Sequence, residues 1–108
     1  MSFAMLYVTC ADHNEAERLS NAMLEDRIVA CTNIYSMNSH FWWQGELSRE
    51  DELVVIMKTR ESLVKIVESK IIELHSYDTP CIIHWTVSAN ESYEKWIEKE
   101  TCGAITDH

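Results

Sequence analysis

The sequence predicts an α+β fold with the order strand, helix, strand, strand, helix, strand, followed by one further helix. Three observations predict it: short apolar runs rich in β-branched and aromatic residues, two stretches with apolar residues at helical spacing, and a long non-helical segment that turns at a glycine. Only two glycines and one proline occur in 108 residues, so regular elements should dominate. This length fits one domain, residues 1–108, with 102–108 as a frayed tail.

The first two elements are predicted to be a buried strand and an amphipathic helix. Residues 3–9 are apolar and rich in β-branched and aromatic side chains, which is typical of a buried strand. Asp12, with Glu15 three residues later, resembles a capping box and indicates a helix start. A helix is therefore expected over 13–26, with an apolar side formed by Ala16, Leu19, Ala22 and Met23.

A long hairpin should follow. Residues 29–43 have no helical period, and Gln44-Gly45 is a turn or bulge signal because glycine allows a positive φ. The apolar run 53–58 predicts a buried strand, and the charged stretch 46–52 before it should be extended or locally irregular. Arms of about twelve residues would span on the order of 40 Å, more than the sheet of a small domain needs. One end should therefore project and seek a partner.

The second half predicts helix, strand and helix. Residues 60–74 carry an apolar stripe with Thr59 as the expected N-cap, a strand should follow Pro80 over 81–87, and Asn90 should cap a helix over 91–100. This order is the ferredoxin-like βαββαβ sandwich, an antiparallel four-stranded sheet with two helices on one face. The other face would be open and apolar, which favours assembly.

Composition excludes several classes of function. A net charge of −9 argues against nucleic-acid binding, which needs a basic face. No apolar run approaches the roughly 18 residues of a membrane span, and no signal peptide is visible. The four cysteines are scattered without metal-ligand spacing, which favours reduced thiols in a cytoplasmic protein. Nucleophile and phosphate-binding motifs do not occur, so the sequence favours a protein that is not an enzyme.

Four segments carry a family resemblance. In chain order they are Ile28-Val-Ala-Cys31-Thr-Asn-Ile34, Phe41-Trp-Trp-Gln-Gly-Glu46, Met57-Lys-Thr59 and His75-Ser-Tyr-Asp-Thr-Pro80. Together they resemble the CutA family of divalent-cation tolerance proteins, from about Leu6 to Trp96. The resemblance implies the same fold, a homotrimer whose hairpins pair across subunits, and a role in tolerance of or response to divalent metal ions, copper among them.

The resemblance also implies a metal site. The family's copper ligands are a cysteine in the first strand and two adjacent histidines, and here Val8 and Leu74 occupy two of these positions while His75 matches. Cys81 is close in sequence, so His75 and Cys81 are the predicted ligands for copper or another divalent transition metal. Cys10 could substitute only if the strand end were displaced. A competing interpretation makes His75 a cation at a helix C-terminus.

A cleft between subunits is the second implied site. In the family it is lined by positions that correspond to Cys31, Trp43, Lys58, Thr59 and Tyr77. Lys58 beside a helix capped by Thr59 would form an anion site. The alternative function is therefore a PII-like trimeric sensor that binds a small anion in this cleft. Two structural interpretations remain: a lysine that extends to the surface, and a purely structural trimeric scaffold.

Overall fold

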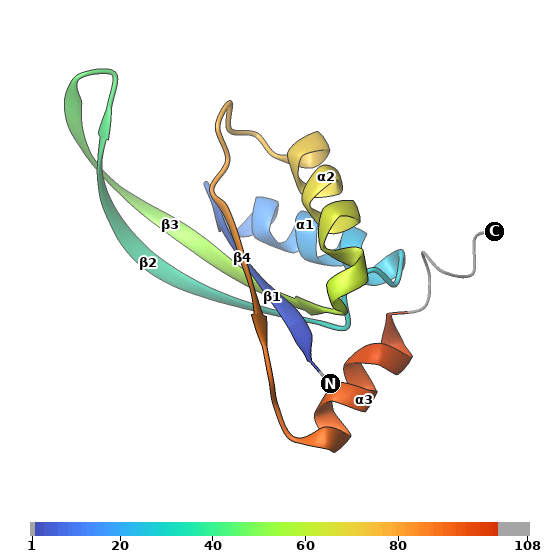
Figure 1. Ribbon diagram of the computed structural model, residues 1–108. Coiled ribbons are helices and arrows are strands. Elements are labelled where there is room, and N and C mark those ends of the chain that lie inside the picture. Colours follow the sequence, from blue (N-terminus) through green and yellow to red (C-terminus); the bar gives the residue numbers. More distant parts are fainter. Residues whose placement is uncertain (1, 102–108) are drawn as a thin grey trace.

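The fold confirms the predicted ferredoxin-like α+β sandwich with its additional C-terminal helix (Figure 1). The computed structural model describes residues 2–101, so the predicted frayed tail lies outside the described residues. Four antiparallel strands form one sheet in the order β2-β3-β1-β4. The elements are β1 (Phe3–Cys10), α1 (His13–Glu25), β2 (Cys31–Trp43), β3 (Glu46–Thr59), a 3-10 turn (Glu61–Leu63), α2 (Val64–Leu74), β4 (Ile82–Val87) and α3 (Glu91–Glu100).

The core lies between the sheet and the helices α1 and α2. Strand alternation sends every second residue of β1 into it, and these residues pair with core residues of β3, as in Leu6 opposite Met57 and Val8 opposite Val55. The helices contribute the apolar stripes that the sequence predicts, and most of these side chains are fully buried. Cys10 ends the same core-facing row of β1, so its thiol points toward the helices.

Helix α1 begins with the predicted cap. Asp12 accepts a hydrogen bond from the Glu15 N–H at 2.8 Å, and the Glu15 carboxylate reaches back to the Ala11 N–H at 3.0 Å. The reciprocal bond of a capping box normally returns to the capping residue, and here it returns one residue earlier. Glu15 is therefore fixed inside the first turn, with only 3% of its surface exposed.

The hairpin is longer and more regular than predicted. Its arms contain 13 and 14 residues, and Gln44 and Gly45 both adopt positive φ values of 51° and 82°, as a two-residue hairpin turn requires. Of the two alternatives left open at 46–52, the extended one is correct, because β2 pairs with β3 without interruption to the turn. Strand β1 pairs with β3 only as far as Leu53, so the hairpin from Glu52 outward projects from the domain (Figure 1).

Two predicted helix caps differ in the structure. Thr59 is the last residue of β3, and its buried hydroxyl donates to the Ile28 carbonyl at 2.6 Å instead of capping a helix. The strand runs one residue further than the apolar pattern suggested, and its alternation turns Thr59 inward. Before α3, the Ala89 N–H donates to the Glu94 carboxylate at 2.7 Å, whereas the Asn90 side chain makes no capping bond.

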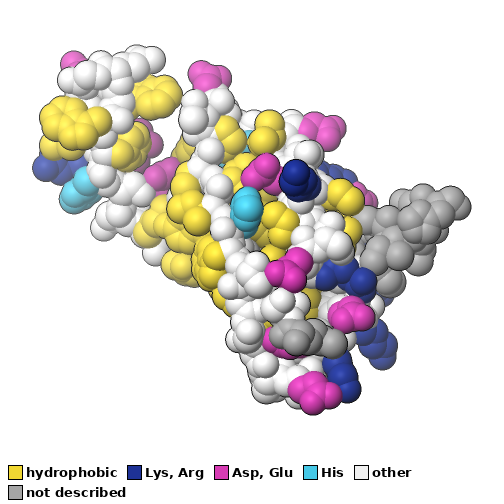
Figure 2. Space-filling view, in the orientation of Figure 1, with side chains coloured by type: hydrophobic (Ala, Val, Ile, Leu, Met, Phe, Trp, Pro, Cys, Tyr) yellow, Lys and Arg dark blue, Asp and Glu magenta, His cyan; other side chains and the backbone are white. Residues whose placement is uncertain are grey.

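The face of the sheet opposite α1 and α2 is largely open, as predicted. Helix α3 covers one end, where Tyr93 packs edge-on against Phe3 with ring centroids 6.0 Å apart. Elsewhere large apolar side chains are uncovered, including Tyr35, Ile83 and Trp85. Figure 2 shows apolar side chains on the projecting hairpin and along the neighbouring part of the sheet. Among the described residues, no helix is long and apolar enough to cross a membrane.

Candidate metal centre

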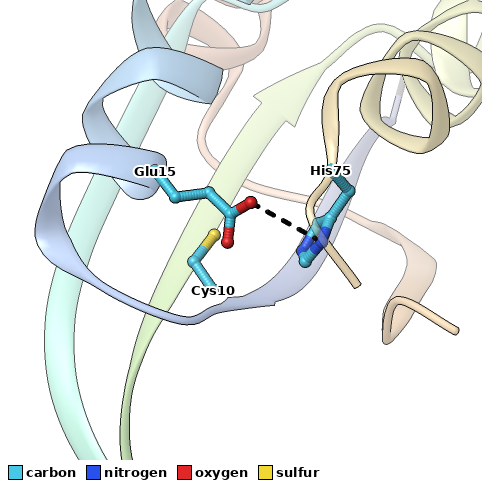
Figure 3. Close-up of side chains that lie close together, drawn as sticks. All are labelled: Cys10, Glu15 and His75. Atoms are coloured by element: carbon cyan, nitrogen blue, oxygen red, sulfur yellow. Dashed lines mark ion pairs between the residues drawn. The ribbon is translucent and has the colours of Figure 1, made fainter. Parts of the chain in front are cut away.

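Cys10, Glu15 and His75 meet at one end of the sheet (Figure 3). Cys10 ends β1, Glu15 lies in the first turn of α1, and His75 directly follows α2. Their sulfur, carboxylate and imidazole ligand atoms all lie within 4.8 Å of one another. The fold makes this group because the end of β1, the start of α1 and the end of α2 converge on the same edge of the core.

His75 is held in one tautomer. Its fully buried ring places Nε2 2.7 Å from the Thr9 carbonyl oxygen, while Nδ1 accepts the Tyr77 N–H at 3.0 Å. Because a carbonyl oxygen only accepts, Nε2 carries the proton and Nδ1 has the lone pair, which accepts the Tyr77 N–H in this structure. Nδ1 lies 3.8 Å from Glu15 Oε2, inside the group. A histidine that ligates a metal usually donates its other N–H to such a partner, so this ring is oriented as a ligand through Nδ1.

Glu15 supplies an ionised carboxylate. Its Oε1 accepts the Ala11 N–H, and its Oε2 accepts the Ser76 N–H at 2.8 Å. Burial alone would raise the pKa of Glu15, but the hydrogen bonds from Ser76 and Ala11 outweigh it and lower the pKa. Arg18 Nη2 also lies 3.5 Å from Oε2, so Oε2 already has two donors, whereas Oε1 has one and keeps capacity for a further contact.

Cys10 supplies a neutral thiol. Burial, together with the neighbouring Glu15 carboxylate, raises the pKa of Cys10 to about 12, although Arg18 acts in the opposite direction. A metal ion binds the thiolate, so uptake at this group must release the thiol proton. Sulfur, nitrogen and oxygen donors in one buried group suit zinc or copper. The donor set and the orientation of His75 therefore fit a divalent transition metal.

Cys81, the second predicted ligand, is not part of this group. It precedes β4, where burial and then the nearby Glu52 carboxylate raise the pKa of the Cys81 thiol. The next residue, Ile82, packs against the core, so alternation places Cys81 on the open side of the sheet, away from the core-facing Cys10. Sequence proximity to His75 was therefore a poor guide. The alternation of β1 was the better signal, because it put Cys10 in the core row.

Within one chain, the predicted cleft residues do not form one site. Cys31 and Lys58 are opposite one another in the β2–β3 register, while Tyr77 contacts Glu52, about 20 Å along β3 from Lys58. Trp43 pairs with Glu46 at the tip, about 40 Å from Lys58. Only a second chain could bring these positions together.

Lys58 does not form the predicted anion site within one chain. Its Nζ lies 3.3 Å from the Tyr93 hydroxyl and 5.5 Å from the centre of that ring, so α3 engages it in a cation–π contact. Thr59 points into the core, and the residues after it start with a 3-10 turn that has no side-chain cap. The expectation of a lysine beside a threonine-capped helix was wrong because the strand carries Thr59 inward.

The fold and this group of donors define a single-domain ferredoxin-like protein with a candidate transition-metal centre. Residues 4–100 match the family described as CutA1 divalent ion tolerance protein, and the chain belongs to this family. The divalent-cation tolerance protein CutA of Pyrococcus horikoshii is 38% identical over 98 residues, which cover 90% of this chain and 96% of that one. A crystal structure of CutA1 from the same organism has a TM-score of 0.88 at 37% identity and covers 91% of this chain and 97% of that one.

A second solved relative is described as the periplasmic divalent cation tolerance protein CutA from Archaeoglobus fulgidus. It has a TM-score of 0.89 at 32% identity, and the match covers 94% of this chain and 99% of that one. A chloroplastic CutA 1 protein of Oryza sativa is 30% identical over 99 residues, which are 90% of this chain and 56% of that protein. The family assignment predicted from the four segments is therefore confirmed.

Proposed function

We propose that this protein acts in divalent-cation tolerance by binding one divalent transition-metal ion per chain at Cys10, Glu15 and His75, without catalysing a reaction. The observation that carries the proposal is the convergence of a thiol, an ionised carboxylate and a tautomer-fixed imidazole in one buried group. Copper is expected to bind more tightly than zinc, because mixed nitrogen and sulfur sites follow the general order of divalent affinities.

The site is closed before a metal ion binds. Cys10 has to lose a proton, and His75 Nδ1 already accepts a hydrogen bond from the Tyr77 N–H. Both requirements reduce the apparent metal affinity. Because the Cys10 proton must be lost, the affinity should also rise with pH. Uptake should therefore be weak at acid pH and should release protons to the buffer.

The test is native mass spectrometry together with calorimetry, with Zn(II) and Cu(II) added to the purified protein. We expect one metal ion per chain, loss of uptake in Cys10→Ser and in His75→Gln, and proton release that changes with the buffer. Cys81→Ser is the matched control, because Cys81 lies on the other side of the sheet, and it should bind as the wild type does. Unchanged uptake in both site variants would contradict the proposal and would assign binding to the acidic surface.

We further propose that the working form is a homotrimer in the cytoplasm. Trp42 is 74% exposed and Trp43 49% exposed on a hairpin that no other element of residues 2–101 covers, which supports burial by neighbouring subunits. Cys10, Cys31 and Cys81 are free thiols, which supports a reducing compartment. Cell fractionation tests the location, and light scattering tests the assembly.

A further inference from the structure

We propose that metal occupancy at Cys10, Glu15 and His75 is coupled to the order of the β2–β3 hairpin through Tyr77. This inference rests on the metal site proposed above and concerns its regulation. The connection is the loop between α2 and β4, in which Ser76 and Tyr77 follow His75 directly.

The loop is held by two atoms that would also ligate a metal ion. The Ser76 N–H donates to Glu15 Oε2 at 2.8 Å, and the Tyr77 N–H donates to His75 Nδ1 at 3.0 Å. A carboxylate oxygen can accept both contacts, but an imidazole nitrogen has a single lone pair. Since Nε2 is committed to the Thr9 carbonyl, ligation through His75 Nδ1 requires the Tyr77 N–H to leave.

Tyr77 connects the His75 ring to strand β3, so a shift of the Tyr77 backbone would reach the sheet. Its ring lies against His75, with centroids 4.7 Å apart, and its hydroxyl donates to Glu52 Oε2 at 2.7 Å. Glu52 is only 7% exposed, so few water molecules can replace this hydroxyl while the hairpin stays in place. We call this hydrogen bond the Tyr77–Glu52 clasp. A hydrogen bond to a carboxylate is among the stronger kinds, and it depends on the position of the Tyr77 backbone.

The Tyr77–Glu52 clasp lies at the base of the hairpin, where β3 leaves the four-stranded sheet. Cys10 pairs with Leu53, the last β3 residue that has β1 as a neighbour, and Glu52 is the next residue outward. From there the strand has only β2 beside it, with Glu52 opposite Met37. An open hollow of about 390 Å³ borders this point, lined by Ser36, Met37, Asn38, Asp51, Glu52 and Leu53. A carboxylate released from the clasp can therefore be hydrated once the hairpin base loosens.

Linkage makes the coupling reciprocal. If ligation weakens the clasp, then removing the clasp must strengthen ligation by the same factor. A hydrogen bond to a charged group is strong enough to change a binding constant by tenfold or more, so Tyr77→Phe is expected to raise zinc affinity about tenfold. Metal-free Tyr77→Phe should have a loosened hairpin base. The wild type should have one only when zinc is bound.

The test combines zinc affinity with hydrogen exchange, using Zn(II) because it does not oxidise thiols. Calorimetry gives the affinity of the wild type and of Tyr77→Phe, and mass spectrometry follows amide exchange in peptides that span 36–53. We expect faster exchange there in zinc-loaded wild type and in metal-free Tyr77→Phe, with no further change when zinc is added to the variant. Tyr93→Phe is the matched control, because it removes a tyrosine hydroxyl near α3, and it should change neither quantity.

Glu52→Gln gives a second, independent measurement. It weakens the clasp from the strand side and leaves the loop sequence intact. Loss of a negative charge should by itself weaken cation binding, so a gain in zinc affinity identifies the clasp as the cause. Zinc bound at one per chain, with unchanged exchange and no affinity gain in either variant, overturns the coupling and leaves the metal site standing. If neither the wild type nor Tyr77→Phe binds zinc, both proposals are overturned.

Discussion

The buried group at Cys10 and the projecting hairpin lie next to each other on the same sheet. The carboxylate and imidazole of the buried group have partners within one chain, whereas the large apolar side chains of the hairpin do not. Glu15 and His75 have hydrogen-bond partners on their carboxylate and imidazole atoms. By contrast, Trp42 and Trp43 on the hairpin remain exposed. Polar groups can be satisfied by a few neighbouring atoms, whereas large aromatic side chains need a surface to cover them.

The difference indicates which part of this protein would gain apolar burial from another chain. A two-stranded ribbon has marginal stability in water, because nothing covers its faces. The hairpin is stabilised from one end by the sheet and by the Tyr77–Glu52 clasp, and the large apolar side chains of its outer part are left uncovered by the described residues. The buried group needs no partner chain. The following predictions test this contrast, from the largest expected effect to the smallest.

Truncation of a hairpin tryptophan should affect assembly most. Trp42→Ala and Trp43→Ala are each expected to weaken the trimer by about 3–5 kcal/mol, because a buried aromatic side chain is lost from the interface. Light scattering should give about three times 12.6 kDa for the wild type at micromolar concentration and a smaller mass for the variants. Trp96→Ala, in α3, is the control and should keep the wild-type mass. A monomeric wild type would remove the contrast altogether.

Glu15→Gln should affect the folded domain itself. The variant is expected to lose about 1.5–3 kcal/mol at pH 7, because an amide cannot accept from both the Ala11 and Ser76 N–H groups as a carboxylate does. The pKa of Glu15 is lowered in the folded state, so its contribution is present above the ordinary glutamate pKa of 4.5 and is lost as the pH falls below it.

Urea unfolding at a series of pH values measures both effects of Glu15→Gln. The variant should be less stable near neutral pH and should show a flatter loss of stability on acidification than the wild type. Glu17→Gln provides the control, since Glu17 is exposed on the same helix and should stay within about 0.5 kcal/mol of the wild type. Equal acid sensitivity in the wild type and Glu15→Gln would show that the carboxylate is not structurally important.

Alkaline pH should destabilise the protein through Cys10. Burial raises the pKa of Cys10 to about 12, so above the ordinary cysteine pKa of 9.0 the unfolded chain loses a thiol proton that the folded chain keeps. Stability should then fall by at most about 1.4 kcal/mol per pH unit from this group. Cys10→Ala should remove that part of the slope. Cys81→Ala should remove less, because Cys81 is only partly buried. The check is denaturant unfolding between pH 8 and 10.

Lys58→Met should have the smallest effect. Within one chain Lys58 makes a cation–π contact with Tyr93, and its loss is expected to cost about 0.5–1 kcal/mol in a thermal melt. A loss of about 3–5 kcal/mol would instead indicate a buried ion pair with a carboxylate of another subunit. That result would mean that the surface in contact with other subunits reaches from the hairpin to the Lys58 end of β3.

The order and type of the elements could be predicted because they depend on local patterns. Apolar alternation, helical spacing and the Gln44-Gly45 turn are patterns that span only a few residues each. They were sufficient to predict the long hairpin. The predictions were left open or were wrong where a neighbouring strand decided the outcome. The charged residues 46–52 form a regular strand because β2 supplies their partners, and Thr59 turns inward because β3 extends to meet β1.

The sequence by itself determined the family and the ferredoxin-like order, and it singled out His75 as a candidate metal ligand. Only the tertiary structure decided that His75 meets Cys10 and Glu15, because these residues lie on three elements whose ends converge at one edge of the core. Spacing along the chain carries no information about such convergence, and it favoured Cys81, which alternation places on the other side of the sheet. The physical reason is that patterning fixes which side of an element faces the core, whereas packing fixes which core-facing side chains become neighbours.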